Sequence, residues 1–388
     1  MNEHEDTRSP TAAKRRAPDS SAAASSKSIK RDIPLIDRDL SILAFNERVL
    51  AWARRKDVPL LERMRYLCIV ASNLDEFFEV RMAPHLLSVH SSVPHPTLTH
   101  HLQELLQRAR SLIAEQYRIY NQSLLPALNR VDLRILSHGE RNHNQRKWVR
   151  DYFHREVKPL LVPVGIDPAH PLPQVANKSL NFIVHLRGKD AFGRNNEIAI
   201  IKIPRILPRV IELPERLAGK GKSFVLLSSV VRAHLSELFA GREVNGFSQF
   251  RVTRQSGLWF DEDDMRDLRV ALIKELPHRN YGRAVRLEVS ANCPTQLSDF
   301  LLQQLQLPKA ALFCVNGPVN LMRLTQFIDM AARESLLFAH YHDSPAQQLQ
   351  GVHSIMDHML KEDVLIHQPF ESFDGVLDFL REAVHDPR

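Results

Sequence analysis

The chain has 388 residues, enough for two or three domains, and its 44% hydrophobic and 25% charged residues are typical of an ordinary soluble protein. Its three cysteines are far apart and show no C-x-x-C spacing, so we expect neither a disulfide framework nor a zinc ribbon. No apolar run is as long as a membrane span, and the N-terminus lacks the apolar core of a signal peptide. The sequence argues against a secreted or integral protein, and a reducing cytoplasm fits.

A formal net charge of +7 and an isoelectric point near 9.4 suit a polyanionic partner. The sign of the charge does not choose among nucleic acid, an acidic membrane surface and an inorganic polyanion. Nucleic acid is disfavoured, because the sequence has no recognisable helix-turn-helix and no aromatic RNA-binding signature.

Residues 1–33 are predicted to form a disordered tail. They are rich in Ser, Ala, Lys and Arg, and they cannot bury enough apolar area to offset the entropy lost on ordering. Lys14–Arg16 could touch a polyanion, but a solvated run of charge is the simpler interpretation.

Three helices are predicted next. Ser41 is a candidate N-cap for the first, and residues 57–59 end that helix and begin the second. Apolar residues recur at helical spacing in all three. They are Ile42, Phe45, Val49 and Trp52; Leu60, Met64, Leu67, Ala71, Leu74, Phe77 and Phe78; and Leu102, Leu105, Leu106, Ala109, Leu112, Ile113 and Tyr117. We therefore predict an all-helical first domain over residues 34–136.

An amide and a carboxylate, Asn73 and Asp75, interrupt the apolar pattern of the second helix. A polar group in such surroundings needs a partner. One interpretation is that both side chains satisfy backbone groups at a helix junction, which short polar side chains favour. The other is that Asn73 is presented to a ligand. The pair His100 and His101 has no third ligand at a suitable spacing, so we expect it to face solvent rather than a metal.

Beyond residue 136 the pattern alternates between strands and helices, which predicts an α+β domain over residues 137–335. Strands are expected at residues 180–186, 197–204, 250–254 and 284–289, the first two as a hairpin-like pair, and helices at residues 148–157, 226–239, 261–274 and 295–305.

Two further stretches resemble phosphate or metal motifs. Gly219–Ser223 ends like a P-loop, but Arg216 stands where the first glycine is needed and no strand precedes it, so we expect a basic loop. The carboxylates of Asp261–Asp264 fall in the first turn of a predicted helix, where negative charge suits the helix dipole without a metal.

The first two helices carry motifs that resemble the start of the large bacterial polyphosphate kinases. The segment Asp39–Leu50 is similar to "LSWLxFNxRVL", and Pro59–Phe77 is similar to "PLLERxxFLxIxSxNLDEF". The resemblance implies that Asn73 contacts the base of ATP. Ile42 stands where the family usually has Trp. This difference alters packing but leaves the roles of the polar residues in the motif unchanged.

The resemblance continues through the α+β domain, in Asp167–Pro171, Arg251–Arg254 and Gly282–Val289, which look like the head domain of the kinase. It implies a domain that mediates dimerisation and lines part of a basic tunnel for the polymer. The sequence does not choose which Arg or Lys would line it.

The stretch Lys361–Phe373 resembles the opening of the first catalytic domain of the family, "DxLLHHPYxSF", with substitutions at Gln368, Phe370 and Glu371. We expect a strand and then a helix over residues 376–383. The predicted fold is thus a multidomain α+β protein: a helical N-terminal domain, an α+β head domain, and over residues 336–388 a linker and the start of a truncated α/β phospholipase-D-like domain.

The resemblance implies reversible transfer of the γ-phosphate of ATP onto inorganic polyphosphate through a phosphohistidine, with Mg²⁺. It also implies a cytoplasmic enzyme, either free in the cytoplasm or peripheral to the inner membrane. The family nucleophile is a His in an H-x-K segment, and none of the nineteen His here is followed two places on by Lys. We therefore name no catalytic residue and no metal ligand, expect His367 to be structural, and expect the isolated chain to be inactive. The alternative is a non-catalytic dimerising or polyanion-binding fragment of a split or degenerate kinase.

Overall fold

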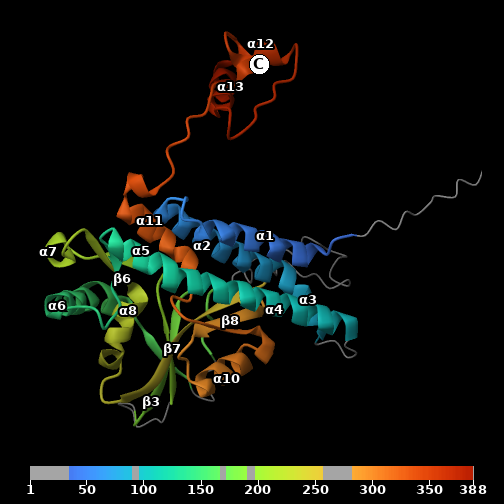
Figure 1. Ribbon diagram of the computed structural model, residues 1–388. Coiled ribbons are helices and arrows are strands. Elements are labelled where there is room, and N and C mark those ends of the chain that lie inside the picture. The colour runs from blue at the N-terminus through green and yellow to red at the C-terminus, as the bar shows by residue number, and fades with distance from the viewer. Residues whose placement is uncertain (1–34, 90–95, 167–171, 190–196, 257–281, 388) are drawn as a thin grey trace, which may run out of the picture. The chain divides into compact units, whose positions relative to one another are not determined.

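The structure is a computed structural model, and it describes residues 35–89, 96–166, 172–189, 197–256 and 282–387 (Figure 1). The expected disordered tail, the predicted helix at residues 261–274 with Asp261–Asp264, and the segment Asp167–Pro171 lie outside the described residues.

The N-terminal part of the chain forms a layer of helices. Its elements are α1 (Arg38–Arg54), α2 (Leu60–Glu76), the π-helix η1 (Phe77–Met82), α3 (Ala83–Val89), α4 (Pro96–Ile119), the π-helix η2 (Tyr120–Leu124) and α5 (Leu125–Arg130). Strand β1 (Leu133–Ile135) follows, so the prediction of an all-helical segment is wrong at its last residues. Helix α1 begins three residues before Ser41, the predicted N-cap, and it carries Asp39 in its first turn, where negative charge is favourable.

Burial confirms the predicted apolar stripe of α4 and corrects that of α1. All seven apolar residues predicted for α4 are buried, from Leu102 to Tyr117. In α1 the buried side chains are Leu43, Asn46, Leu50 and Ala53, whereas Phe45 and Trp52 are 50% and 39% exposed. Ile42 and Val49 of the predicted stripe are partly buried and pack against the core, so the prediction is wrong for Phe45 and Trp52 but not for these two residues.

The following part contains a six-stranded sheet of order β2-β4-β3-β7-β8-β9. The strands are β2 (Pro163–Ile166), β3 (Asn181–Arg187), β4 (Ile198–Lys202), β7 (Glu243–Arg254), β8 (Ala284–Ser290) and β9 (Leu312–Val315). All neighbours are antiparallel except β8 and β9. The predicted pairing of the strands near residues 180 and 200 is confirmed, since β3 and β4 are antiparallel neighbours.

A second, three-stranded sheet of order β1-β6-β5 was not predicted from the sequence. Its strands β5 (Val210–Glu212) and β6 (Lys222–Leu226) are three and five residues long, too short to show a clear alternation. The helices around the two sheets include α6 (His143–Tyr152), α7 (Glu215–Ala218), α8 (Leu227–Ala233), α10 (Thr295–Gln304) and α11 (Thr325–Ala331). The predicted helices at residues 148–157, 226–239 and 295–305 are therefore present, the first two continuing as π- or 3-10 turns.

The described C-terminal residues contain the helices α12 (Ile355–Met359) and α13 (Asp374–His385), which confirms the helix predicted over residues 376–383. The strand expected within Lys361–Phe373 is not formed. A strand needs a neighbour to pair with, and the described part of this stretch makes only an isolated bridge between Ser344 and Glu371.

Alternating side chains of the large sheet face two different layers, as Figure 1 shows for α4 and α10 on either side of β8. Ile183, Val252 and Leu287 belong to the core that includes Leu301 of α10. Phe182 on β3 belongs instead to the core shared with the helical layer. The period of two along each strand thus builds a helix, sheet, helix sandwich.

Four charged side chains meet where the helical layer packs on the sheet. Asp75 Oδ2 accepts from Arg251 Nη1 at 2.9 Å, and its Oδ1 accepts from Arg286 Nη2. Glu288 binds both arginines, with 3.2 Å between its Oε2 and Arg286 Nη2. All four side chains are at most 6% exposed. We call Asp75, Arg251, Arg286 and Glu288 the buried ion network.

The sheet register and an aromatic ring complete this network. Arg251 pairs in register with Glu288, and Thr253 with Arg286, so these side chains leave the sheet on the same face. Thr253 Oγ1 accepts from Arg286 Nε at 3.1 Å, and the ring of Phe78 lies 4.4 Å from the Arg286 guanidinium carbon. Two positive and two negative charges balance, which is the condition for burying them at tolerable cost.

The pKa values follow from this balance. Burial alone would raise the pKa of Asp75, but the charges of Arg251 and Arg286 outweigh it and lower the pKa below its usual 3.8. A carboxyl whose pKa is lowered on folding contributes stability above its unfolded pKa, and that contribution is lost as the pH falls through the lowered value. The network should therefore weaken in acid and not at neutral pH.

We predict that Asp75→Asn lowers the free energy of unfolding by about 3–5 kcal/mol, because it leaves a buried excess positive charge. Urea unfolding followed by circular dichroism measures this. Glu76→Gln is the matched control, since Glu76 is the exposed neighbour and its loss should change stability little. A change below about 1 kcal/mol for Asp75→Asn would contradict the prediction.

Candidate functional site

Two asparagines from neighbouring helices form a polar contact at the predicted ligand residue. Asn73 Nδ2 on α2 donates to Asn46 Oδ1 on α1 at 2.9 Å, and Asn46 Nδ2 donates to the carbonyl of Ile42 at 3.1 Å. Asn46 is 1% exposed, whereas Asn73 is only partly buried. Among the described residues no protein donor is found for Asn73 Oδ1. Asn46 thus holds one side of the Asn73 amide and leaves an acceptor available.

Asn73 and Asp75 play different parts because they lie on different faces of α2. Residues two apart on an α-helix are rotated by about 200°, so they cannot share a partner. Asp75 points to the arginines of the sheet, and Asn73 points to α1. The interpretation that both satisfy backbone groups is therefore wrong, since the partners of both are side chains.

The exposed surface of the helix near Asn73 is mixed, because Glu76 at i+3 is exposed and charged while other exposed neighbours are apolar. Ile69 and Val80, at i−4 and i+7 from Asn73, are 38% and 49% exposed. Phe45, next to Asn46 in the chain, is half exposed, and the Arg48 guanidinium carbon lies 5.8 Å from its ring centre. One hydrogen-bonding amide among apolar and aromatic side chains is the chemistry that suits a flat heterocycle.

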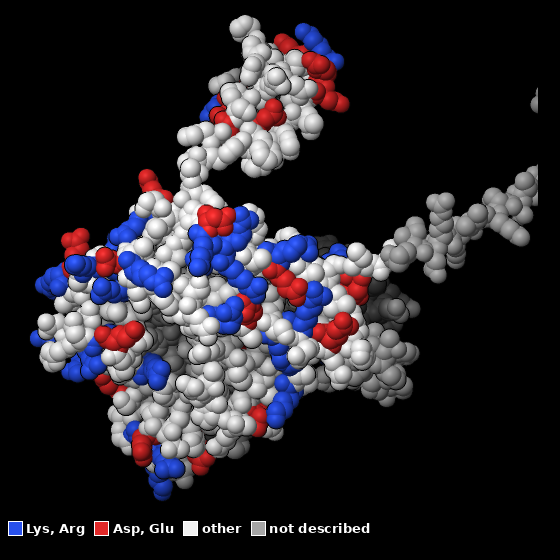
Figure 2. Space-filling view, viewed as in Figure 1, with Lys and Arg blue, Asp and Glu red and all other residues white. Residues whose placement is uncertain are grey.

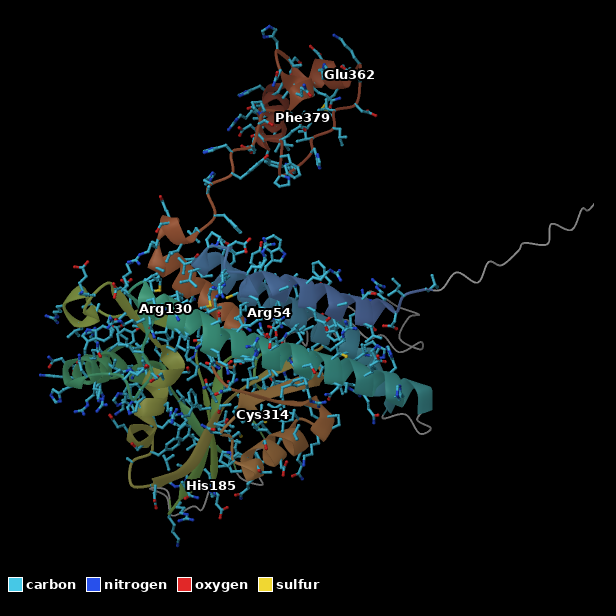
Figure 3. The ribbon with its side chains drawn as sticks, viewed as in Figure 1. Arg54, Arg130, His185, Cys314, Glu362 and Phe379 are labelled. Carbon is cyan, nitrogen blue, oxygen red and sulfur yellow. The ribbon has the colours of Figure 1, made fainter. Side chains whose placement is uncertain are left out.

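A cavity of about 850 Å³ lies between the helices and the sheet. Figure 2 shows the surface hollowed between α5 and α8. The lining of this cavity combines polar side chains, among them Asn129, Ser229, Arg232 and Gln249, with apolar ones such as Phe182. The amide, hydroxyl and guanidinium groups can hydrogen-bond a hydrated or anionic ligand.

A smaller cavity of about 40 Å³ adjoins it and shares Gln249. Lys178, Arg209 and Arg323 line it. Within the described part of the chain, the buried atoms Arg209 Nη1, Gln249 Oε1 and Asn320 Oδ1 have no hydrogen-bond partner. Burial, and then the positive charges of Arg323 and Arg205, lower the pKa of Arg209 to about 10. An anion here would offset the repulsion between Arg209 and its neighbouring arginines, and it would accept a hydrogen bond from Arg209 Nη1.

Other residues singled out from the sequence take up simpler positions. His100 is exposed as expected, whereas His101 is partly buried. Within Gly219–Ser223 the two glycines have φ of 75° and 71°, and Lys222 and Ser223 begin β6, so the stretch is a turn into a strand and not a P-loop. His367 is exposed and its ring lies 5.0 Å from that of Phe370.

Several residues that build this region were not found by sequence reasoning. The sequence analysis does not single out Asn46, although its spacing of three from Leu43 and four from Leu50 places it on the buried face of α1. Arg209 and Asn320 gave no local signal, because their surroundings come from distant segments. No described helix is both long and apolar enough to cross a membrane.

Two family models match the chain. The polyphosphate kinase N-terminal domain matches residues 35–136, and the polyphosphate kinase middle domain matches residues 144–327. Proteins named polyphosphate kinase are similar over 91% of the chain, with 47% identity for Neisseria meningitidis serogroup A, 45% for Xylella fastidiosa and 44% for Burkholderia cenocepacia. The chain covers 52%, 51% and 52% of these relatives, so it spans about half of their length.

A solved structure shows the same likeness. The crystal structure of polyphosphate kinase from Porphyromonas gingivalis superposes with a TM-score of 0.73 and 25% identity, over 92% of this chain and 50% of that one. The helical layer and the sheet described above therefore correspond to the matched N-terminal and middle domains. Since both domains are matched in order and relatives reach 47% identity, the chain belongs to the polyphosphate kinase family.

Proposed function

We propose that the chain is the N-terminal and middle part of a kinase that reversibly transfers the γ-phosphate of ATP onto inorganic polyphosphate. Family membership supports the proposed reaction, and the geometry at Asn73 supports the part proposed for these residues. The observation that carries the proposal is the Asn46–Asn73 contact, which leaves Oδ1 of the partly exposed Asn73 available to a ligand.

In this proposal Asn73 recognises the base of ATP. Its Nδ2 is engaged by Asn46, so its Oδ1 accepts a hydrogen bond from the exocyclic amine of adenine. The ring of Phe45 and the side chain of Ile69 offer apolar contact to the base. Asn46 is a positioning residue, because it fixes the Asn73 amide and is itself buried.

The polymer is proposed to pass near the two adjoining cavities. Phosphoryl transfer needs cations to offset phosphate charge, and Lys178, Arg209, Arg232 and Arg323 supply them there. Arg209 is the strongest candidate of the four, since its buried Nη1 has no partner among the described residues. This selects individual residues where the sequence could not.

The described residues do not fit a Mg²⁺ site. Mg²⁺ prefers oxygen ligands, and the candidate metal-binding cluster among the described residues contains two imidazoles. Asp261–Asp264 lie outside the described part. We therefore assign Mg²⁺ binding, the phosphohistidine and the phospholipase-D-like fold to the half of the family protein that this chain does not span.

The cytoplasm remains the proposed compartment, supported by three free cysteines.

A second candidate is a non-catalytic dimerising or polyanion-binding protein. The net charge of +7 favours it, and so do the Lys and Arg side chains that gather over the helices in Figure 2. Such a protein would bind the same polyphosphate as the proposed kinase but would catalyse no phosphoryl transfer.

We predict that the purified 388-residue chain makes no polyphosphate from ATP and Mg²⁺, because no His of the sequence lies in an H-x-K segment. A radiolabelled-ATP assay tests this, with a complete polyphosphate kinase as the positive control. Polymer formed by the chain alone would overturn the assignment of the nucleophile to the other half.

We predict a dimer through the middle domain. Among the described strands, β2 lies at an edge of the sheet, and Leu160 and Val162 just before it are 45% and 68% exposed, which offers an apolar edge to a second chain. Light scattering at micromolar concentration should give twice the 44.6 kDa mass of the chain. A monomer that persists to tens of micromolar would count against it.

We predict that Asn73→Ala, in a complete kinase carrying these residues, weakens ATP binding by about 5- to 150-fold, the range set by roughly 1–3 kcal/mol for an unpaired polar partner. Asn73→Ala also leaves the buried Asn46 Oδ1 without its donor, so we expect a loss of stability of about 1–3 kcal/mol without ATP, and the ATP-induced shift is the quantity that tests the role of Asn73. Ser72→Ala is the matched control, because Ser72 is exposed and adjacent. Thermal melts with and without ATP report both quantities. Equal ATP-induced shifts in wild type and Asn73→Ala would show that Asn73 has only a structural role.

A further inference from the structure

Three potential metal ligands from three helices converge at one end of the helical layer. They are Asp39 in the first turn of α1, His85 in α3 and His101 in α4. Their ligand atoms all lie within 4.8 Å of one another, and His85 Nε2 is 2.8 Å from Asp39 Oδ2. The rings of His85 and His101 are 5.3 Å apart and inclined by 65°. The three side chains are partly buried, so an ion could reach them from solvent.

The ligand set selects a class of ion. Two imidazoles and one carboxylate suit Zn²⁺ and related first-row transition ions, whereas Mg²⁺ and Ca²⁺ prefer oxygen ligands. Tetrahedral zinc with bonds of about 2.0–2.2 Å places its ligands roughly 3.3 Å apart. The contact between His85 and Asp39 would open by about half an ångström and His101 would move inward, changes that side-chain rotation can supply. A water molecule would take the fourth position.

We propose that Asp39, His85 and His101 form a zinc-binding site that clips the α3 and α4 helices to the start of α1. This site is separate from Asn73 and from the polymer path, and no step of phosphoryl transfer is routed through it. It corrects the expectation that His101 lacks a third ligand. The sequence could not reveal the set, because its members are 46 and 16 residues apart and on different helices.

The competing explanation is a simple hydrogen-bonded contact. Asp39 suits the first turn of a helix by its charge alone, and His85 can bond to it without an ion. The two explanations differ in what added metal does. A zinc site predicts one tightly bound ion per chain and a higher melting temperature with Zn²⁺, and a hydrogen-bonded contact predicts neither.

The test uses the full 388-residue chain freed of any histidine tag. Zn²⁺ binding is measured by competition with a chromogenic chelator, Co²⁺ is added as a spectroscopic probe of imidazole coordination, and melting temperatures are compared in Zn²⁺, Mg²⁺ and EDTA. We expect one Zn²⁺ per chain, a tetrahedral Co²⁺ spectrum, and a rise in melting temperature with Zn²⁺ and not with Mg²⁺. The wild-type Co²⁺ spectrum remains decisive even where a variant folds poorly.

Variants locate the site. Loss of a residue that only hydrogen-bonds to a metal ligand lowers metal affinity by roughly 10–100-fold. Because His85 and His101 are proposed as ligands themselves, His85→Ala and His101→Ala should each lower the Zn²⁺ affinity by at least that factor. His100→Ala is the matched control, because His100 is exposed and adjacent to His101, and it should leave the affinity unchanged. Wild type that binds Zn²⁺ no better than His85→Ala, or a loss equal for His100→Ala and His101→Ala, would overturn the proposal.

Discussion

Burying two arginines and two carboxylates between the helices and the sheet is the constraint on which the other features depend. Removing such charges from water costs several kcal/mol each, and only close opposite charges and further hydrogen bonds offset that cost. Arg251, Arg286, Glu288 and Asp75 meet this condition, with Thr253 and the ring of Phe78 completing the shell of Arg286. A displacement of α2 against the sheet would leave charges unpaired, so the network specifies one arrangement of the two layers.

The same constraint positions the candidate ATP contact. Asp75 anchors one face of α2 to the sheet, and two residues earlier Asn73 emerges on another face toward Asn46. Just beyond Asp75 the helix turns into the π-helix η1, where Glu79 bonds to Lys178 Nζ at 2.9 Å and to Asn177. Lys178 in turn lines the small basic cavity. Short π-helical stretches are frequent at functional sites, and here one connects the proposed base contact with the proposed polymer path.

The sequence predicted the features that depend on neighbouring residues. The buried stripe of α4 from Leu102 to Tyr117 followed from apolar residues spaced three and four apart, and the pairing of β3 with β4 followed from two strand-like segments close together in the chain. The partners of Asp75 lie 176 and 211 residues away, so no spacing within α2 could indicate them. Asn46 of α1 is likewise buried against a partner on another helix, Asn73, which its own local sequence does not reveal. The short strands of the β1-β6-β5 sheet were missed because β1 forms only by pairing with β6, which lies far along the chain.

A double-mutant cycle between Asp75 and Arg286 tests most directly the claim that the buried ion network joins the two layers. The free energies of unfolding of wild type, Asp75→Ala, Arg286→Met and the double variant would be measured in urea at neutral pH. Each single change leaves an uncompensated buried charge and the double change does not, so we expect the double variant to be more stable than the sum of the two losses implies, by about 1–3 kcal/mol. Losses that add to within about 0.5 kcal/mol would contradict it.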